Sequence, residues 1–549
     1  MTLALTLARL GVQAMVVERN PDTTQHPKMD ITNVRSMELF RRLGLAQSLR
    51  MVAVPERHCF DVTWVTTMAG HELYRFRYPS VIEKRAEIAR HNDGSQPLEP
   101  AMRVSQVLIE PALKRAVEAE ALVLSRFGTA FEDCKQDADG VTAVVRETAT
   151  GRTETIRCAY LAGCDGGTSR VRSCLGIQLE GQPRVAQRYM VHFRSSARDI
   201  LQRWGIAWHY QSPRGTLIAQ DDVDHWTLHT RPKPGDDLDR VDPNALLTRF
   251  MGGSIPREII LANPWTPHLL VAETYRQGRV FLAGDAAHQY IPTGGYGMNT
   301  GIGDACDLGW KLAALVRGFG GPTLLASYDA ERRPVGLRNR QASGTHTDVR
   351  MAIAQAYADA GNCVYEPSAE SDSRRAVLAA RIAALGNAEN ESYGIELGYA
   401  YPRSPIVCAE TDAEISEDPV RYVPTAAPGA RLPSILLADR SALFDRLGPW
   451  FTLIAFGAAP DAELVTAAMR RGMPLEVVRI DQPGLQHIYR ASQLLVRPDQ
   501  HVAWRGRNAG DDADAIIARC LGQKDSPLKS EIGPSRRSLN RNGRNRRVT

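Results

Sequence analysis

The chain has 549 residues, of which 43% are hydrophobic and 23% charged, and its formal net charge is +5. These values indicate an ordinary globular protein of two or three domains, and no apolar run reaches the roughly 18 to 20 residues of a membrane span. Seven basic residues and one acid lie between Pro527 and Thr549, so this tail accounts for the net positive charge and the rest of the chain gives no reason to expect a nucleic-acid partner.

The first elements alternate between helix and strand. Residues 1–10 carry leucines at helical spacing, and Gly11 follows where a helix ends. VQAMVVERN predicts a buried strand ending at Glu18, and residues 33–43 predict a helix with one apolar face. Strand and helix alternate again at residues 155–177, so this part of the chain is expected to be α/β.

The sequence pattern changes in the second third of the chain. Short runs broken by Pro, Gly and Asp predict an antiparallel sheet between about 180 and 275, and RVFLAGD (279–285) then predicts a return to the α/β pattern. Helices are expected at about 302–317 and 324–332. After the Pro/Gly-rich segment 422–434, a β-α-β-β-β-α order predicts a thioredoxin-like domain, which lacks the CxxC of a redox module and is expected to serve packing or dimerisation.

One stretch combines several glycines, which give a flexible backbone, with a nearby aspartate. In AGDAAHQYIPTGGYGMNTGIGDACDLGWKLA (283–313), Asp285 ends a strand at the sheet edge where open α/β folds bind their ligands. The glycines of 294–297 let a backbone approach a flat or phosphorylated ligand. We expect the following helix to begin near 299–301, where its free N–H groups favour negative charge. An anionic reduced flavin ring fits that demand.

This stretch resembles the GD motif of the FAD-dependent aromatic hydroxylases, the para-hydroxybenzoate hydroxylase and phenol hydroxylase group. GCDGGTSRVRSCLGI resembles the second motif of the same group, and HPKMDITNVRSMELFRRLGL and RVSQVLIEPAL are similar to two further flavin-contacting segments. VRPDQHVAWRG is similar to the close of the thioredoxin-like domain in the phenol hydroxylase branch. The resemblance runs from Met1 to about Gly522.

The resemblance implies a set of FAD-binding residues. They are Glu18, Arg35, Arg103, Gln106, Asp165, Arg172, Asp285, Pro292, Gly295, Met298 and Asn299. It implies that Glu18 binds the adenosine ribose, which its position at a strand end also suggests. Arg35 and Arg103 are implied to meet the pyrophosphate or flavin side, with Gln106 close by, although an arginine in NVRSMELF taken alone is as often a solvated helix residue.

The two glycine-containing motifs have further implied roles. Asp165 and Arg172 belong to the motif that lies near both FAD and the nicotinamide donor. Asp285 is implied to hold ribitol or pyrophosphate, and Pro292 to border the flavin.

At the helix start, Gly295, Met298 and Asn299 are implied to line the N1–O2 edge of the flavin ring. Two neighbours have plainer interpretations. His288 is expected to be a structural hydrogen-bonding residue, and Cys306 to belong to the core.

The N-terminus departs from the family pattern. The family begins with a strand and a GxGxxG turn, and residues 1–10 match the helix that normally follows the last glycine. The turn supplies the main pyrophosphate cradle. We therefore expect the true start to lie upstream of Met1, with a damaged gene product as the alternative, and we expect the chain as written to bind FAD poorly.

The expected architecture is an FAD-binding Rossmann-like α/β domain interleaved with an antiparallel substrate sheet, followed by the thioredoxin-like domain. The boundaries are 1–180 and 275–350 for the FAD-binding domain (50–100 partly facing the substrate), 181–274 for the sheet, 351–424 for a helical connection, 425–523 for the thioredoxin-like domain and 524–549 for a disordered basic tail.

The leading functional hypothesis is a monooxygenase that hydroxylates a phenolic ring. The resemblance implies that NADH or NADPH reduces FAD and that O₂ then gives a flavin C4a-hydroperoxide. Substrate contacts are expected from the sheet, where Trp208, His209, Tyr210 and Trp226 are candidates, although each is individually more typical of strand packing. No residue is identified as the base that activates the phenol.

Two alternatives stay open: a flavin hydroxylase of polycyclic polyketides, and a non-catalytic remnant that keeps the dimerising C-terminal domain. Nine scattered cysteines without a CxxC pair favour free thiols in a reducing cytoplasm, with neither a disulfide framework nor a metal site. A homodimer without membrane or nucleic-acid partners is expected.

Overall fold

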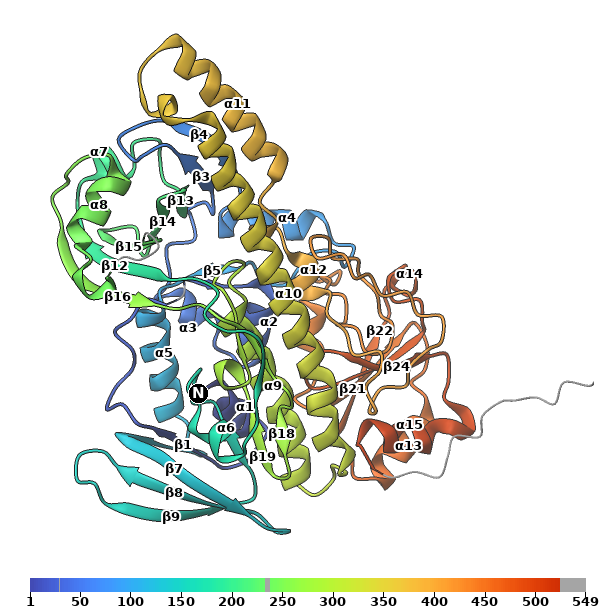
Figure 1. Ribbon diagram of the computed structural model, residues 1–549. Helices are drawn as coiled ribbons and strands as arrows, with labels where there is room; N and C mark the ends of the chain where they lie inside the picture. The colour runs from blue at the N-terminus through green and yellow to red at the C-terminus, as the bar shows by residue number, and fades with distance from the viewer. Residues whose placement is uncertain (29, 233–236, 524–549) are drawn as a thin grey trace, which may run out of the picture.

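The computed structural model describes residues 1–28, 30–232 and 237–523. The basic tail expected over 524–549 lies outside the described residues. The chain forms an N-terminal α/β part, a seven-stranded sheet above it and a C-terminal domain beside it, and the long helix α10 runs past the first two (Figure 1). The expected α/β class with a separate sheet and C-terminal domain is confirmed. No described helix is long and apolar enough to cross a bilayer.

The N-terminal α/β part is built on two separate sets of parallel strands. In one, β1 (Ala14–Glu18) pairs with β6 (Val123–Phe127); in the other, β10 (Leu161–Gly163) pairs with β19 (Val280–Leu282). Its helices are α1 (Thr2–Arg9), α2 (Val34–Arg42), α3 (Ala46–Arg50), α4 (Val81–Arg90), α5 (Gln106–Glu118), α6 (Arg170–Cys174) and α9 (Tyr296–Val316). The predicted first helix, first strand and second helix are confirmed within one or two residues. The expectation that the first strand is buried is wrong, because β1 pairs only with β6 among the described strands and is half-buried, with Met15 exposed. The expected strand and GxGxxG turn upstream of Met1 stay a prediction.

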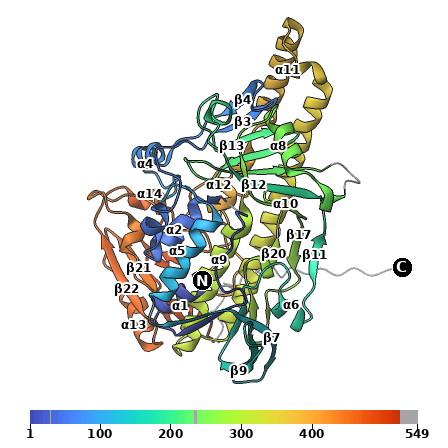
Figure 2. The ribbon, with the colours of Figure 1, turned by 90° about the vertical axis from the view of Figure 1, so that its left-hand side faces the viewer.

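Smaller sheets complete this part. They are β2 (Ile31–Thr32) with β5 (Met102–Arg103); β7 (Thr129–Gln136), β8 (Val141–Glu147) and β9 (Thr153–Cys158); β11 (Leu179–Gln182), β17 (Leu269–Ala272) and β20 (His288–Gln289); and β18 (Arg276–Gln277), which extends the β10–β19 pair. Figure 2 shows α1, α5 and α9 close together, with the C-terminal domain next to them.

The seven-stranded sheet has the order β16-β12-β15-β14-β13-β3-β4. Its strands are β3 (Val62–Val65), β4 (Glu72–Phe76), β12 (Arg188–Arg194), β13 (His209–Ser212), β14 (Gly215–Ala219), β15 (His225–Thr230) and β16 (Glu258–Trp265). All pairings are antiparallel except β13 with β3. The sheet predicted over 181–274 therefore gains two strands from the first hundred residues. One face packs an apolar core against α7 (Arg198–Leu201) and α8 (Pro243–Met251).

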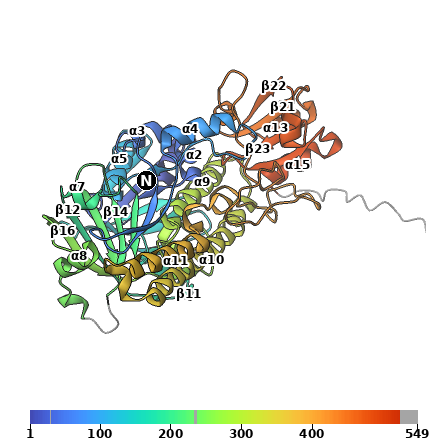
Figure 3. The same ribbon diagram turned by 90° about the horizontal axis from the view of Figure 1, so that it is seen from above.

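Helix α10 (Thr323–Ala360) is much longer than predicted. The prediction ended it at 332, before Pro334, but the helix continues through this proline. A proline costs its helix one backbone hydrogen bond, and here Val335, Asn339 and Ser343 are buried on the following turns, so tertiary packing outweighs that cost. The predicted helical connection consequently begins inside α10 and contains α11 (Ala369–Leu385) and α12 (Tyr393–Leu397). Figure 3 shows α10 and α11 side by side.

The C-terminal domain has the predicted β-α-β-β-β-α order, with one extra short helix. Its elements are β21 (Phe451–Phe456), α13 (Ala462–Arg470), β22 (Leu475–Ile480), α14 (Leu485–Tyr489), β23 (Gln493–Val496), β24 (Val502–Gly506) and α15 (Ala513–Cys520). The sheet order is β22-β21-β23-β24, so the predicted hairpin is confirmed. Trp310 of α9 and Phe451 of β21 share one apolar core, with ring centroids 5.7 Å apart, which joins this domain to the N-terminal part.

Candidate active site

Helix α9 opens on an uncapped N-terminus. It begins at Tyr296, with Gly295 as the residue before it at φ +66°, and neither a capping side chain nor a first-turn acid is present. The predicted start at 299–301 is therefore wrong by several residues. Gly301 lies inside the helix, and a glycine suits that position because a Cβ there would come within 3.0 Å of the Gly284 Cα. The free N–H groups and the helix dipole favour an electron-rich ligand edge at this point.

Asp285 lies beside this helix start. It follows β19, and a Cβ added to Gly297 would be 3.9 Å from its Oδ1. The carboxylate is solvent-exposed and accepts no hydrogen bond from the residues that the structure describes. Even so, desolvation by the surrounding protein raises its pKa, against the opposing charges of His288 and Lys28. Asp285 therefore offers an unpaired carboxylate beside the start of α9.

Arg172 joins the two glycine-containing motifs. Its Nη1 donates to the Ala286 carbonyl at 2.8 Å and its Nη2 to the Gly167 carbonyl at 2.9 Å. Asp165 orders the same segment, because its carboxylate accepts from the Ser169 hydroxyl at 2.5 Å and from the backbone N–H groups at the start of α6. Arg172 thus joins the segment that Asp165 orders to the residue after Asp285, while the implied cofactor roles of Asp165, Arg172 and Asp285 stay predictions.

Asn299 binds a distant segment to the turn at residues 292–297 that precedes α9, which we call the glycine turn. Its Oδ1 accepts from the Asn33 N–H at 3.0 Å, and its Nδ2 donates to the Ile31 and Gly295 carbonyls at 3.1 and 2.7 Å. Pro292 is exposed at the other end of the turn, where its carbonyl accepts from the Gly295 N–H at 2.9 Å. Residues 31–33 are therefore part of the site's wall.

Arg103 lies where this wall meets the sheet. It pairs with Ile31 in the β2–β5 ladder, and its Nη2 donates to the Ala219 carbonyl at 2.9 Å. Its buried Nε has no hydrogen-bond partner among the described residues. Burial lowers its pKa to about 10, with the charge of nearby Asp30 opposing that effect.

Arg35 and Glu18 stand apart from the glycine turn. Arg35 is buried, which differs from the solvated interpretation, and its guanidinium donates to the Asp499 carbonyl and the Gln500 Oε1, both at 2.7 Å. These contacts hold the C-terminal domain. The Glu18 Oε1 accepts from the Asn20 N–H at 2.8 Å at the end of β1. No described contact joins either residue to the turn, so their implied cofactor roles stay predictions.

The remaining expected residues have local partners. Gln106 begins α5 and donates to Glu110 at 2.6 Å, while Met298 packs against the apolar cluster beneath α9. His288 is fully buried with its Nε2 2.9 Å from Asp304, so its structural role is confirmed, and Cys306 lies in the core as expected.

The seven-stranded sheet presents a polar face opposite its apolar one. Tyr210 and Trp226 belong to the apolar core, as ordinary strand packing predicts, whereas His209 and Gln211 alternate to the other side. The register places one row of side chains across six strands on that polar side. The row consists of Trp64, Gln211, Thr216, His229, Met190 and Asn263.

Buried polar atoms without partners gather on this polar face. Among the described residues, they are Trp64 Nε1, His209 Nδ1 and Nε2, Gln211 Oε1, His229 Nδ1, Asn263 Oδ1 and Trp265 Nε1. Folded proteins rarely leave buried polar atoms unpaired, so their concentration on one face indicates a surface that binds a polar aromatic ligand or ordered water.

Asp30 connects the polar face to the glycine turn. It precedes Ile31, whose Cγ2 would lie 2.5 Å from a Cβ on Gly295, and its Oδ2 lies 3.4 Å from the His209 Nε2. Trp208 Nε1 also donates to this carboxylate. Burial would raise the pKa of Asp30, but hydrogen bonds and charge from His209 and its neighbours outweigh burial and lower it. Asp30 is thus an ionised partner for the histidine.

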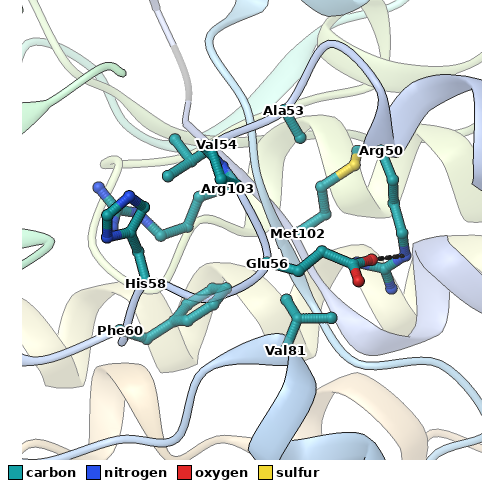
Figure 4. Close-up of a pocket in the computed structure, with 10 residues that line it drawn as sticks. Arg50, Ala53, Val54, Glu56, His58, Phe60, Val81, Met102 and Arg103 are labelled. Atoms are coloured by element: carbon teal, nitrogen blue, oxygen red, sulfur yellow. Dashed lines mark ion pairs between the residues drawn. The ribbon is translucent and has the colours of Figure 1, made fainter. Parts of the chain in front are cut away.

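A small pocket lies behind Arg103. Figure 4 shows it between the 50–60 segment and β5, with His58 and Phe60 on the side of Arg103 and the Arg50–Glu56 ion pair on the other. Its volume of about 250 Å³, mouth included, is smaller than most ligand sites, and none of the glycine-turn residues lines it. It is therefore separate from the surface between the turn and the polar face.

Sequence reasoning missed Asp30 because KMDI carries no periodic pattern. The alternation in IAWHYQS did place His209 and Gln211 on one side, and this pattern was the available indication for the polar face.

Comparisons with known proteins agree with this geometry. A family model described as "FAD binding domain" matches residues 1–343, and one described as "Aromatic-ring hydroxylase, C-terminal" matches 425–523. The FAD-dependent monooxygenase apdD of Emericella nidulans is 36% identical, over 97% of this chain and 90% of its own. The 4-methyl-5-nitrocatechol 5-monooxygenase of a Burkholderia species is 31% identical over 94% of each chain. RebC soaked with chromopyrrolic acid, with bound 7-carboxy-K252c, superposes with a TM-score of 0.86 at 33% identity, over 95% of this chain and 97% of that one.

Proposed function

This chain belongs to the family of FAD-dependent aromatic-ring hydroxylases, and on that premise we propose that it hydroxylates an aromatic ring that carries a hydroxyl group, using NAD(P)H and O₂. The observation that carries the proposal is the Asp30–His209 pair, which lies between the glycine turn and the polar sheet face. Relatives named for a nitrocatechol and for polyketides support an aromatic substrate.

The residues at the turn fit FAD. The uncapped start of α9 suits the electron-rich N1–O2 edge of a flavin, and the unpaired Asp285 carboxylate suits ribitol hydroxyls. The Glu18 carboxylate, whose Oε2 takes no hydrogen bond from the described residues, suits a ribose. When bound, FAD supplies the redox chemistry by accepting a hydride from the nicotinamide and activating O₂.

The protein's own contribution is proton control and positioning. A phenol becomes a better nucleophile as it loses its proton, and His209 is the available base on the polar face, because its Nδ1 has no hydrogen-bond partner among the described residues while its Nε2 lies 3.4 Å from Asp30. Asp30 has a lowered pKa, so it stays ionised, orients His209 and stabilises the imidazolium that forms. Gln211, on the same face, offers its Oε1 to a second substrate donor.

The first test is the visible flavin spectrum of the purified chain, followed by oxidation of NADH and NADPH with a panel of phenols. Because the chain as written is expected to bind FAD poorly, FAD is added in excess, and we then expect FAD binding and phenol-stimulated oxidation with a hydroxylated product. If neither this chain nor a version extended in frame upstream of Met1 takes up added FAD, the remnant alternative is favoured, whereas bound FAD without a response to any phenol would contradict the hydroxylase proposal.

The second test is the His209→Asn variant. General-base catalysis is worth about 10²–10⁴-fold, so we expect the hydroxylation rate to fall at least about 100-fold at pH 7. The deficit should shrink near pH 10, where a simple phenol ionises without help. His487→Asn, at an exposed position of the C-terminal domain, is the matched control. A deficit that is the same at every pH would argue against the base role.

The choice of nicotinamide donor, the oligomeric state and the cellular location also belong to the proposal. The choice between NADH and NADPH follows from the oxidation assay. The homodimer and the cytoplasmic location, both expected from the resemblance and the cysteine pattern, stay predictions that sedimentation and fractionation test.

A further inference from the structure

Three arginines converge at one end of the polar sheet face. Arg188 begins β12 and Arg231 follows β15, and the Tyr189–Thr230 pairing places these two arginines directly opposite each other on the next rung of the ladder. Arg350 reaches the same face from α10, where its Nη1 donates to the Thr216 hydroxyl at 3.1 Å.

The positive charge of this cluster is only partly balanced. Arg350 has an ion pair with Glu389 at 2.9 Å. Arg188 donates only to the carbonyl of Gln187, and Arg231 makes no hydrogen bond or ion pair with the residues that the structure describes. Burial, together with the charges of Arg231 and Arg350, lowers the pKa of Arg188 to about 10. Like charges directly opposite in a ladder are destabilising, so the free protein bears a cost that an anionic ligand would relieve.

The cluster and the proposed base lie on the same face but far apart. His209 and His192 occupy one row three strands apart, and Arg188 is four residues from His192 along β12. With strand spacings of about 4.8 Å and about 3.4 Å per residue, the Cα atoms of His209 and Arg188 are roughly 20 Å apart. A ligand that touches both ends is therefore longer than one ring.

We propose that Arg188 and Arg231 bind an anionic oxygen group, such as a carboxylate, at the far end of an extended aromatic substrate whose reacting ring lies against His209. Guanidinium groups suit this role because their planar forks match carboxylate oxygens. The proposal rests on the proposed function for the placement of the reacting ring. It selects acidic substrates of two or more rings over a simple phenol.

The test is calorimetric binding of matched probes to the full chain. The acids are 4′-hydroxybiphenyl-4-carboxylate and its three-ring analogue, and the uncharged counterparts are 4-phenylphenol and hydroxyterphenyl. Because charge-assisted bidentate bonds are strong, we expect at least one acid to bind about tenfold or more tightly than its counterpart. Arg188→Gln and Arg231→Gln should reduce that preference to within about twofold and leave the uncharged probes unaffected.

Controls separate binding from folding. Arg194→Gln, at the other end of β12, should keep the preference, and Arg188→Lys should keep part of it. Since the arginines repel each other, Arg188→Gln should leave the melting temperature unchanged or raise it; a lowered melting temperature would indicate a structural role and overturn the proposal. No preference for either acid would overturn it as well.

The flavin and phenol assays are read separately from these titrations. An arginine-dependent acid preference in a protein that hydroxylates no phenol would leave the anion site standing and remove the hydroxylase proposal. Phenol hydroxylation without an acid preference would leave the hydroxylase proposal standing and remove the anion site.

Discussion

Arg497 of the C-terminal domain donates to Glu331 of α10 through both terminal nitrogens, at 2.7 and 2.8 Å, and neither side chain is exposed. Arg497 also donates to Asp307 of α9 at 3.0 Å and to Asp499 at 2.6 Å. Lys311 bonds to Glu331 from the other side at 2.5 Å. One buried network thus fixes the C-terminal domain to the two long helices that carry the candidate site.

This network predicts that Arg497→Met destabilises the whole protein. Removing one partner of a buried ion pair strands the other charge, which costs about 3–5 kcal/mol of unfolding free energy. Urea unfolding measures the change. Arg479→Met, which removes an exposed ion pair with Asp481, is the matched control and should change little. Equal effects of the two substitutions would show that the network does not anchor the domain.

Gly295→Ala should abolish flavin binding. The residue has φ +66° and a Cβ would lie 2.5 Å from Ile31 Cγ2, so alanine adds a clash to backbone strain. Gly318→Ala provides the comparison, because φ is +83° there but nothing lies within 4 Å of the added Cβ. It should cost about 1–2 kcal/mol in stability and keep the flavin spectrum. If the two variants titrate FAD alike, close approach at Gly295 is unimportant.

Asn299→Asp should loosen the wall over the glycine turn. The substitution removes the two N–H donors to Ile31 and Gly295 and buries a carboxylate in their place. Leaving such groups unpaired costs about 1–3 kcal/mol, and FAD affinity should fall about tenfold. Asn92→Asp, at an exposed asparagine that bonds to Leu436, controls for the change in charge. Flavin fluorescence titration measures both variants.

His501 predicts a loss of stability in mild acid. Burial, opposed by Asp499 and reinforced by Arg35 and Arg497, lowers its pKa from 6.5 to about 4. Because the unfolded chain binds this proton more readily, stability is complete above pH 6.5 and falls as the pH drops towards 4. The loss between pH 7 and pH 5 is about 2 kcal/mol.

Urea unfolding of the wild type and of His501→Gln at those two pH values isolates this contribution. The variant should show a pH dependence that is smaller by that amount. If the unfolding free energy of both proteins depends on pH equally, His501 takes up its proton in the folded protein as readily as in the unfolded chain, and the prediction is wrong.

Much of the local structure followed from sequence patterns. Leucines at helical spacing predicted α1, the apolar run ending at Glu18 predicted β1, and the hairpin of the C-terminal domain followed from its turn residues. The GD motif placed Asp285 close to the end of a strand, but β19 already ends at Leu282 and Asp285 lies in the short 3-10 turn Gly284–Ala286 that follows it. These features depend on neighbours within a few residues, and such short-range rules act on the local chain alone.

Other features depended on contacts between distant segments. The start of α9 differs from the prediction because Gly297 and Gly301 are helical residues, and Gly301 is a glycine on account of its close approach to Gly284, which lies elsewhere in the chain. The end of α10 was misplaced because buried side chains beyond Pro334 hold the helix. Arg35 binds the C-terminal domain, 464 residues along the chain, which no local pattern could indicate.

The sequence by itself determined the family, the α/β class, the FAD motif and the alternation that separates the two faces of the sheet. The tertiary structure decided which of these features meet: Asp30 reaches His209, and Arg188 faces Arg231. The physical reason is that periodicity and turn chemistry act through neighbouring residues, whereas a site is assembled from side chains whose contacts depend on how separate sheets and helices pack.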